Sequence, residues 1–264
     1  MSVLTQFIFR LGFGLALAMA CTSPRLVVSG FFRVHLWVLL GLNVLAVMVA
    51  WTSPERFSLW PPMIAATLSY LGSVAWLYEK PRSGRVLLWL VAGVCLVGAW
   101  SAAEWPTGES GVGRSSSSPA VVRAGAQLLH WLDPLTGGLV LGGTFAAMLL
   151  GHWYLNEPSM ELSPIKRLVL LMGVAILLRS VVCGLGLAGE WLSFGVPETS
   201  HVLFVALRWL SGLVGTMVVA VMAWETLKIP NTQSATGILY VGVITTFLGE
   251  LTAQLLSAEA HYPL

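Results

Sequence analysis

The chain has 264 residues, of which 56% are hydrophobic and only 10% charged, and its formal charge is +2. Soluble domains carry about 25% charged residues, because a surface in water needs them. This composition excludes a water-soluble fold, and the absence of a basic run excludes nucleic acid as a partner. We therefore expect an all-α, polytopic membrane helical bundle, with the lipid bilayer as its solvent.

A spanning helix needs about 20 mostly apolar residues. The sequence has eight such segments, separated by Pro, Gly, Ser and charged residues, and they make residues 1–264 a single transmembrane domain. The predicted spans are 2–22, 31–52, 60–78, 84–103, 134–154, 166–189, 199–226 and 235–257.

Lys and Arg sort to one set of loops, those after the first, third, fifth and seventh spans. The positive-inside rule then predicts both termini on the non-cytoplasmic side of a bacterial-type inner membrane. The segment ending at Cys21 loosely resembles a lipoprotein cleavage site. We expect the first span to be retained, because Ala18 and Met19 fit that pattern poorly and the first positive charge comes only at Arg10.

The one long polar segment, residues 104–119, contains four consecutive serines and predicts a flexible outer loop. Residues 120–133 then alternate apolar and polar positions at helical spacing, which favours a short interfacial helix. Pro134 follows, and we expect it to turn the chain into the fifth span.

The fifth span carries small residues at helical spacing, which let neighbouring backbones approach closely in a membrane. We expect it to be the central helix. The two ridges are Gly138, Gly142 and Ala146, and Gly143, Ala147 and Gly151.

Motifs of soluble chemistry are missing from the sequence. The G-x-G-x-x-G pattern at 184–189 lies inside an apolar run and not between a strand and a helix start, so we expect packing glycines and no nucleotide. The cysteines Cys21, Cys95 and Cys183 are far apart and predict small core residues, with neither a disulfide nor a zinc site.

Ionisable residues inside the spans are the strongest functional signal, because a charge in the bilayer needs a partner or water. These ionisable residues predict one polar cluster lined by spans one, six, seven and eight. His130 and Asp133 are expected at a similar depth in the membrane. The alternative is a set of ion pairs, such as Arg208 with Glu250, that only fix helix register. The predicted cluster contains Arg10, Arg179, Arg208, Glu250, Glu190 and His201.

A second polar group is expected at the cytoplasmic side, where Asn231 or Thr232 would cap the last span. Its histidines also permit haem b, with His35 facing His152 on this side or His130 facing His201 on the other. The candidate binding residues are His35, His152, Tyr154, Asn156, Glu225 and Gln233.

The leading hypothesis from the sequence is a subunit of a respiratory or other redox complex that binds a quinone between helices, with further membrane or peripheral subunits as partners. His152 or Glu225 would exchange the proton, and Tyr154 or Asn156 would bond a quinone carbonyl. One alternative is a transporter or channel for a small solute or ion, lined by the intramembrane arginines and Glu250. Another is a structural or assembly protein without a cofactor. No catalytic residue can be assigned.

Overall fold

The computed structural model describes residues 2–52, 59–103, 120–194, 199–229, 231–260 and 262–263. Throughout these ranges the chain is helical apart from short turns, which confirms the all-α bundle. The predicted outer loop at 104–119 lies outside the described residues. The elements are α1 Ser2–Cys21, α2 Ser29–Thr52, α3 Trp60–Leu77, α4 Pro81–Ser101, α5 Ala120–Asn156, α6 Ser163–Phe194, α7 Thr199–Leu207, η2 Arg208–Gly215, α8 Thr216–Lys228 and α9 Thr232–Glu259.

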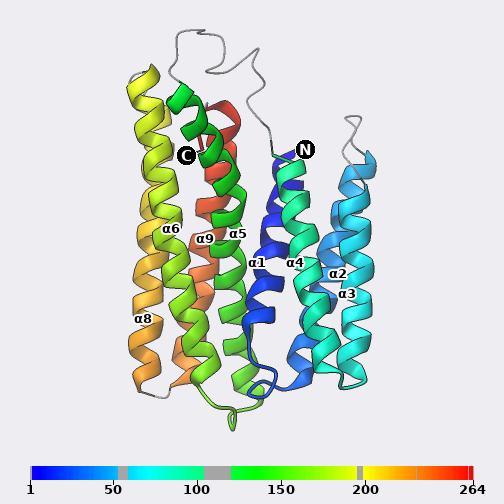
Figure 1. Cartoon of the computed structure of the whole chain (residues 1–264). Coiled ribbons are helices and arrows are strands. Elements are labelled where there is room, and N and C mark those ends of the chain that lie inside the picture. The colour runs from blue at the N-terminus through cyan, green and yellow to red at the C-terminus, as the bar shows by residue number, and fades with distance from the viewer. Residues whose placement is uncertain are drawn as a thin grey trace.

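Seven stretches among the described residues are long and apolar enough to cross a membrane, with α7, η2 and α8 forming one of them. The remaining predicted span, the third in the chain, is helix α3. It lies at the expected place but is not one of the seven. It is short, and Pro61, Pro62 and two buried serines make it less apolar. It nevertheless packs beside α2 and α4 in the bundle (Figure 1).

The surface of the bundle is apolar while several charges lie inside. Leu210 and Ile244 are 66% and 67% exposed, whereas Arg179 is 0% exposed. A soluble protein shows the opposite distribution, because water solvates charge and expels hydrocarbon. The chain is thus a multi-pass membrane protein whose outer side chains are solvated by lipid.

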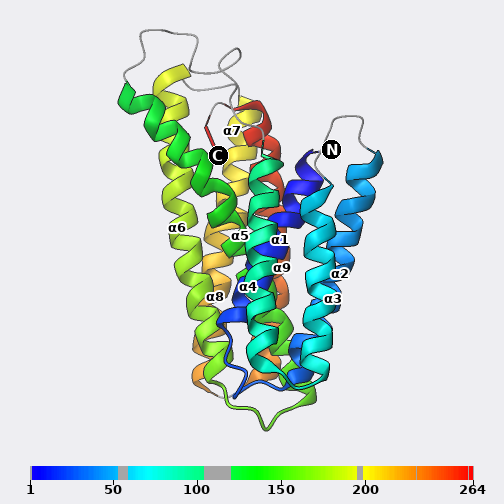
Figure 2. The same ribbon diagram turned by 45° about the vertical axis from the view of Figure 1, so that its right-hand side comes forward.

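The helices form two groups that meet along α1 and α5 (Figures 1 and 2). At this crossing a Cβ added to Gly14 would lie 1.8 Å from the carbonyl oxygen of Gly138, and one added to Gly142 would lie 2.0 Å from the carbonyl carbon of Gly14. The first small-residue ridge of the fifth span therefore packs against α1. Of the second ridge, Gly151 meets Thr236 of α9, whereas a Cβ on Gly143 would meet nothing within 4 Å.

The predicted interfacial helix is not separate from the fifth span, because α5 continues through Pro134 without a break. Side chains hydrogen-bond to the carbonyls beside it: Trp100 of α4 donates to the oxygen of Trp131 at 3.0 Å, and Thr136 donates to that of Leu132 at 2.8 Å. Such substitutes make proline tolerable inside membrane helices. The expected interfacial helix is thus the first part of α5, which slants away from the rest (Figure 2).

The seventh span is interrupted by a π-helical segment, η2, between α7 and α8. Gly212 of η2 crosses Gly249 of α9 so closely that a Cβ on Gly249 would lie 2.2 Å from the Gly212 Cα. Long π-helical segments are rare and are frequently found at functional sites. The first residue of η2 is the buried Arg208.

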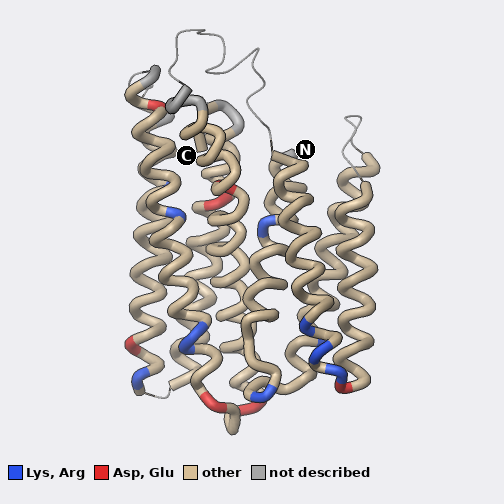
Figure 3. The backbone as a smooth tube through the Cα atoms, in the orientation of Figure 1, with Lys and Arg blue, Asp and Glu red and all other residues tan. Residues whose placement is uncertain are grey.

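Charged residues outside the interior are concentrated at one end of the bundle, opposite the ends at which α1 begins and α9 finishes (Figure 3). This asymmetry is the pattern on which the predicted orientation rests. Which end faces the cytoplasm remains a prediction.

Candidate functional site

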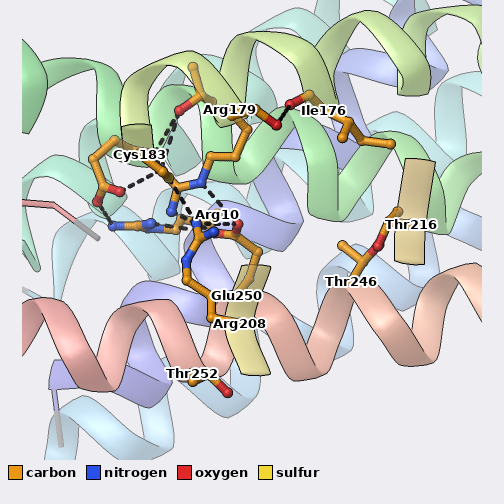
Figure 4. A network of polar contacts seen from close by, with 12 residues as sticks. Arg10, Ile176, Arg179, Cys183, Arg208, Thr216, Thr246, Glu250 and Thr252 are labelled. Carbon is orange, nitrogen blue, oxygen red and sulfur yellow. Dashed lines mark hydrogen bonds and ion pairs between the residues drawn. The ribbon is translucent and has the colours of Figure 1, made fainter. Parts of the chain in front are cut away.

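Five charged side chains from five elements meet inside the bundle (Figure 4). We call them, with Cys183, the arginine network. No residue of the network is more than 7% exposed, so lipid does not solvate the charges. Its members are Arg10 of α1, Asp133 of α5, Arg179 and Cys183 of α6, Arg208 of η2 and Glu250 of α9.

Arg179 is the centre of the network. Its Nε donates to Glu250 Oε1 and its Nη2 to Glu250 Oε2, each at 2.9 Å, which is the bidentate geometry that arginine and carboxylate favour. Its Nη1 donates to Asp133 Oδ1 at 2.5 Å and lies 3.3 Å from the Thr136 hydroxyl. One guanidinium group therefore holds both carboxylates.

The other two arginines lie on either side of this centre. Arg10 Nη2 donates to Asp133 Oδ2, and Arg10 Nη1 lies 3.9 Å from Glu250 Oε2. Arg208 Nη2 lies 3.6 Å from Glu250 Oε1 and donates to Cys183 Sγ at 2.8 Å. Glu250 thus has all three guanidinium groups within ion-pair distance.

Gly137 of α5 allows the charges to lie against the helix backbone. A Cβ at this position would lie 2.7 Å from Glu250 Oε2 and 2.9 Å from Arg10 Nη1. The same turn of α5 supplies Asp133 and Thr136. Any larger residue at 137 would push the network apart.

A cluster of hydroxyl groups lies about one helical turn along α9 from Glu250. Thr246 of α9 donates to Thr216 at 3.3 Å and to Thr144 of α5 at 3.5 Å, and Thr216 is also 3.0 Å from the Thr245 hydroxyl. The polar lining of α9 therefore extends from the network toward the middle of the bundle. Figure 4 shows Thr216 and Thr246 beside the charged group.

The predicted polar cluster is found for four of its six residues, Arg10, Arg179, Arg208 and Glu250, and the expected contact of Arg208 with Glu250 is present. The other two are not in the network. Glu190 of α6 accepts a hydrogen bond from the backbone N–H of Tyr262 at 3.2 Å, and His201 lies in α7 with a side chain outside the described part. His130 is half-buried on the slanted part of α5.

The residues of the predicted cytoplasmic-side site lie at one end of the bundle, where two of them, Tyr154 and Glu225, bond to residues outside the predicted set. Tyr154 is buried and donates to the carbonyl of Glu161, and Glu225 pairs with Lys228 at 2.5 Å. Asn156 and Gln233 are exposed at helix ends. The sequence prediction grouped these residues by their depth along the helices, without knowing which way each side chain points around its helix.

The two histidines at this end have different aromatic neighbours. His35 is buried, has its Nδ1 2.6 Å from the Phe31 carbonyl oxygen, and packs against Trp153 with ring centroids 6.1 Å apart. His152 is exposed and its Nδ1 lies 3.3 Å from the Tyr240 hydroxyl. The neighbour of the His152 ring is thus a phenol, and that of the His35 ring is an indole.

Three buried residues in or beside the network were not assigned to the cluster from the sequence. Asp133 was placed in the interfacial helix, because Pro134 was expected to end that helix. Cys183 was interpreted as a small core residue, although its place one turn after Arg179 was an available signal. Gln254, 3% exposed and one turn after Glu250, was overlooked as a buried amide on the same stripe of α9.

The last candidate motif of the sequence, the glycine pattern at 184–189, lies within α6. A Cβ on Gly186 would lie 1.9 Å from the Pro263 carbonyl oxygen, and one on Gly189 would lie 3.0 Å from the Tyr262 ring. These glycines receive the C-terminal residues of the chain against the helix. Packing accounts for both.

Comparison with known families, curated proteins and solved structures gives no match to this chain.

Proposed function

We propose that this chain is a membrane transporter for a small solute, which it binds at the arginine network. The observation that carries the proposal is that five elements direct their charges to one closed interior position while the outer surface stays apolar. Burying charge in a membrane protein is costly, and intramembrane ionisable groups commonly mark substrate and ion pathways.

The hydroxyl cluster supports a route along α9. The groups that would succeed one another along this helix are Gln254, Glu250 and Thr246, each about one turn apart. Farther from Glu250 than Thr246, α9 and α8 contribute the buried apolar side chains of Leu239 and Val219. A closed site of this kind suits a carrier that exposes its site alternately to each side, and not an open pore.

Two irregular helices beside the network support the proposal that part of the bundle moves during transport. Arg208 begins the π-helical η2, and Asp133 directly precedes Pro134 of α5. Transporters commonly build their sites from interrupted helices, which supply charged or backbone groups to the solute and allow one bundle to rock against another. Both interruptions here carry a residue of the network.

The test is solute equilibration in proteoliposomes, followed by stopped-flow light scattering. The solutes are urea, glycerol, glycine and, with valinomycin, potassium chloride and potassium nitrate. We expect at least one to equilibrate faster than in empty liposomes, Arg208→Ala to abolish the gain and Arg208→Lys to retain part of it. Arg33→Ala, which removes an exposed arginine, is the control.

The transporter proposal fails if no solute enters faster than in empty liposomes, or if correctly folded Arg208→Ala matches the wild type. Retained transport in that variant would favour the structural role, in which the ion pairs only organise the bundle.

A second candidate, a quinone-binding subunit of a redox complex, is favoured by the contact of His152 with Tyr240. The two side chains are exposed on the bundle, so a lipid-soluble molecule would meet an imidazole and a phenol together. Its test is the lipid extract of the purified protein and the quenching of tryptophan fluorescence by added ubiquinone. Absence of a quinone from the extract together with no quenching would eliminate this candidate.

A further inference from the structure

A groove of about 270 Å³ lies between α6 and α8 on the outside of the bundle. The two helices are neighbours and run in opposite directions (Figure 1). The lining is apolar, and Leu170, Val174 and Leu177 of α6 are exposed along it. Because the outside of a multi-pass membrane protein faces hydrocarbon, acyl chains of the lipid have direct access to this groove.

Gly173 gives the groove its depth. The lining residues around it on α6, Leu170, Val174 and Leu177, all carry large side chains, and the glycine leaves a gap between them. A Cβ added at Gly173 would meet nothing within 4 Å, in contrast to Gly142, where a helix crossing fills the space. The groove therefore has room for added hydrocarbon.

The length of the groove matches the hydrocarbon of one leaflet. On α6 the lining extends from Val169 to Leu177, and on α8 from Met217 to Trp224. These stretches of helix rise about 10–12 Å, against about 15 Å for half of the hydrocarbon core of a bilayer. An acyl chain lying in the groove would thus place its headgroup just beyond one end of it.

Each of the two helices carries a lysine at the same end of the groove. Lys166 lies four residues before Leu170 on α6, and Lys228 lies four residues after Trp224 on α8. Residues four apart share a helix face, so each lysine continues the stripe that lines the groove. This is the end of the bundle at which charged residues are concentrated (Figure 3). Trp and Lys at the border of an apolar surface are typical of the headgroup level of a membrane.

The carboxylates described near these lysines leave them accessible to a headgroup. Lys228 Nζ donates to Glu225 Oε1 at 2.5 Å, but the two side chains are 58% and 57% exposed. Exposed ion pairs are weak, so a phosphate can compete for this lysine. Glu161 lies in the connection before α6, where its Oε2 is 3.5 Å from the Ser163 hydroxyl.

From the groove, its length and its two lysines, we infer that α6 and α8 bind one anionic phospholipid. Its acyl chain occupies the groove and its phosphate lies at Lys166 and Lys228. Lysine binds phosphate as a compact charge, and basic residues at a membrane surface attract anionic lipids. A zwitterionic lipid has the same chain without the net charge. The site uses no residue of the arginine network, so it does not depend on the proposed transport function.

The test is to count the lipids bound to the purified protein in detergent by native mass spectrometry. The protein is titrated with phosphatidylglycerol or, separately, with phosphatidylcholine of the same acyl chains. We expect one copy of phosphatidylglycerol to bind at least about 10-fold more tightly than phosphatidylcholine, because two lysines act on its charge. Lys166→Gln and Lys228→Gln should each weaken that copy by about 5-fold, the effect of one basic residue at an anionic surface.

Two matched controls accompany these variants. Lys80→Gln removes an exposed lysine between α3 and α4 and should bind phosphatidylglycerol like the wild type. Gly173→Leu should fill the groove and abolish the tightly bound copy, while leucine also favours the helix. Gly93→Leu adds the same side chain at an exposed glycine of α4, with nothing within 4 Å of its Cβ, and should leave binding unchanged.

Several outcomes would overturn the inference. These are equal affinity for the two lipids, equal binding by Gly173→Leu and Gly93→Leu, or equal weakening by Lys80→Gln and Lys166→Gln. Dimers that Gly173→Leu dissociates would show that a second copy of the chain fills the groove, and would overturn it too. Tight binding of phosphatidylglycerol that needs Gly173 and both groove lysines would support the site even in a protein that moves no solute.

Discussion

Arg179 and Glu250 are joined by two parallel hydrogen bonds, each 2.9 Å long, between helices α6 and α9. Neither residue is more than 3% exposed. The pair fixes the direction of both side chains, because the planar fork of arginine matches the carboxylate. Arg179 can therefore hold Asp133 with its remaining nitrogen.

Arg179→Lys should destabilise the protein although it keeps the charge. The ammonium group is a point donor and cannot make the paired bonds to Glu250 while also reaching Asp133. We expect a loss of about 2 kcal/mol, the size of a hydrogen bond to a charged group. The measurement is thermal unfolding in detergent, with Arg33→Lys as control, and equal unfolding temperatures of the two variants would contradict it.

Removing Glu250 alone should be worse than removing it together with Arg208. Glu250→Gln removes the carboxylate that all three guanidinium groups share, and we expect a loss of about 3–5 kcal/mol. The double variant with Arg208→Gln should recover part of that stability but not transport. If the double variant transports like the wild type, these two charges only organise the bundle.

Gly142→Ala should separate α1 from α5, because its Cβ would lie 2.0 Å from the backbone of Gly14. We expect destabilisation of about 1–3 kcal/mol, as for other overpacked sites. Its neighbour Gly143 is an ideal control, since a Cβ there meets nothing within 4 Å. Gly143→Ala should be neutral or more stable than the wild type, by up to about 1 kcal/mol. Equal thermal stability of the two variants would show that the helices do not meet in this way.

Gly249→Ala should impair transport, because its Cβ would lie 2.2 Å from the Cα of Gly212 and would displace η2. Displacing η2 moves Arg208 away from Glu250. Gly237→Ala, in the same helix but with open space around its Cβ, should transport normally. The assay is the proteoliposome measurement with the solute found for the wild type.

Single-cysteine labelling tests the topology in a background without the exposed native Cys21. Ser83→Cys lies in the exposed first turn of α4, and Ser116→Cys lies in the serine-rich segment. One predicted span, 84–103, lies between the two positions and places them on opposite faces of the membrane. A membrane-impermeant maleimide should therefore label Ser116→Cys from outside intact cells and Ser83→Cys only after permeabilisation. Labelling of both from the same side would contradict the orientation.

The sequence was sufficient for the helices and for most of the network. Long apolar runs predict spans because lipid offers no hydrogen bonds to an open backbone. Arg10, Arg179, Arg208 and Glu250 were predicted to meet because each is too costly to leave alone in the bilayer. The second argument also required these spans to be neighbours, and the ion pairs of Glu250 with the three arginines show that they are.

What the sequence did not reveal depends on how the helices are rotated and where they cross. Asp133 was misplaced because proline usually ends a helix, and only the compensating bonds from Trp100 and Thr136 show why it does not do so here. The crossing of Gly212 with Gly249 could not be predicted, since each span contains other glycines and the sequence does not show which of them meet. The residues grouped as a cytoplasmic-side site were chosen by depth alone, and the structure pairs Glu225 with Lys228 and Tyr154 with the Glu161 carbonyl.

The π-helical segment η2 sets the rotation of the seventh span about its own axis. An α-helix turns by about 100° for each residue, so the wider turns of η2 rotate α7 relative to α8 about their common axis. Deleting one residue between 209 and 215 would let the span return to regular winding. Arg208 would then point toward lipid. The span would still be long enough to cross the membrane but would no longer contribute a charge to the network.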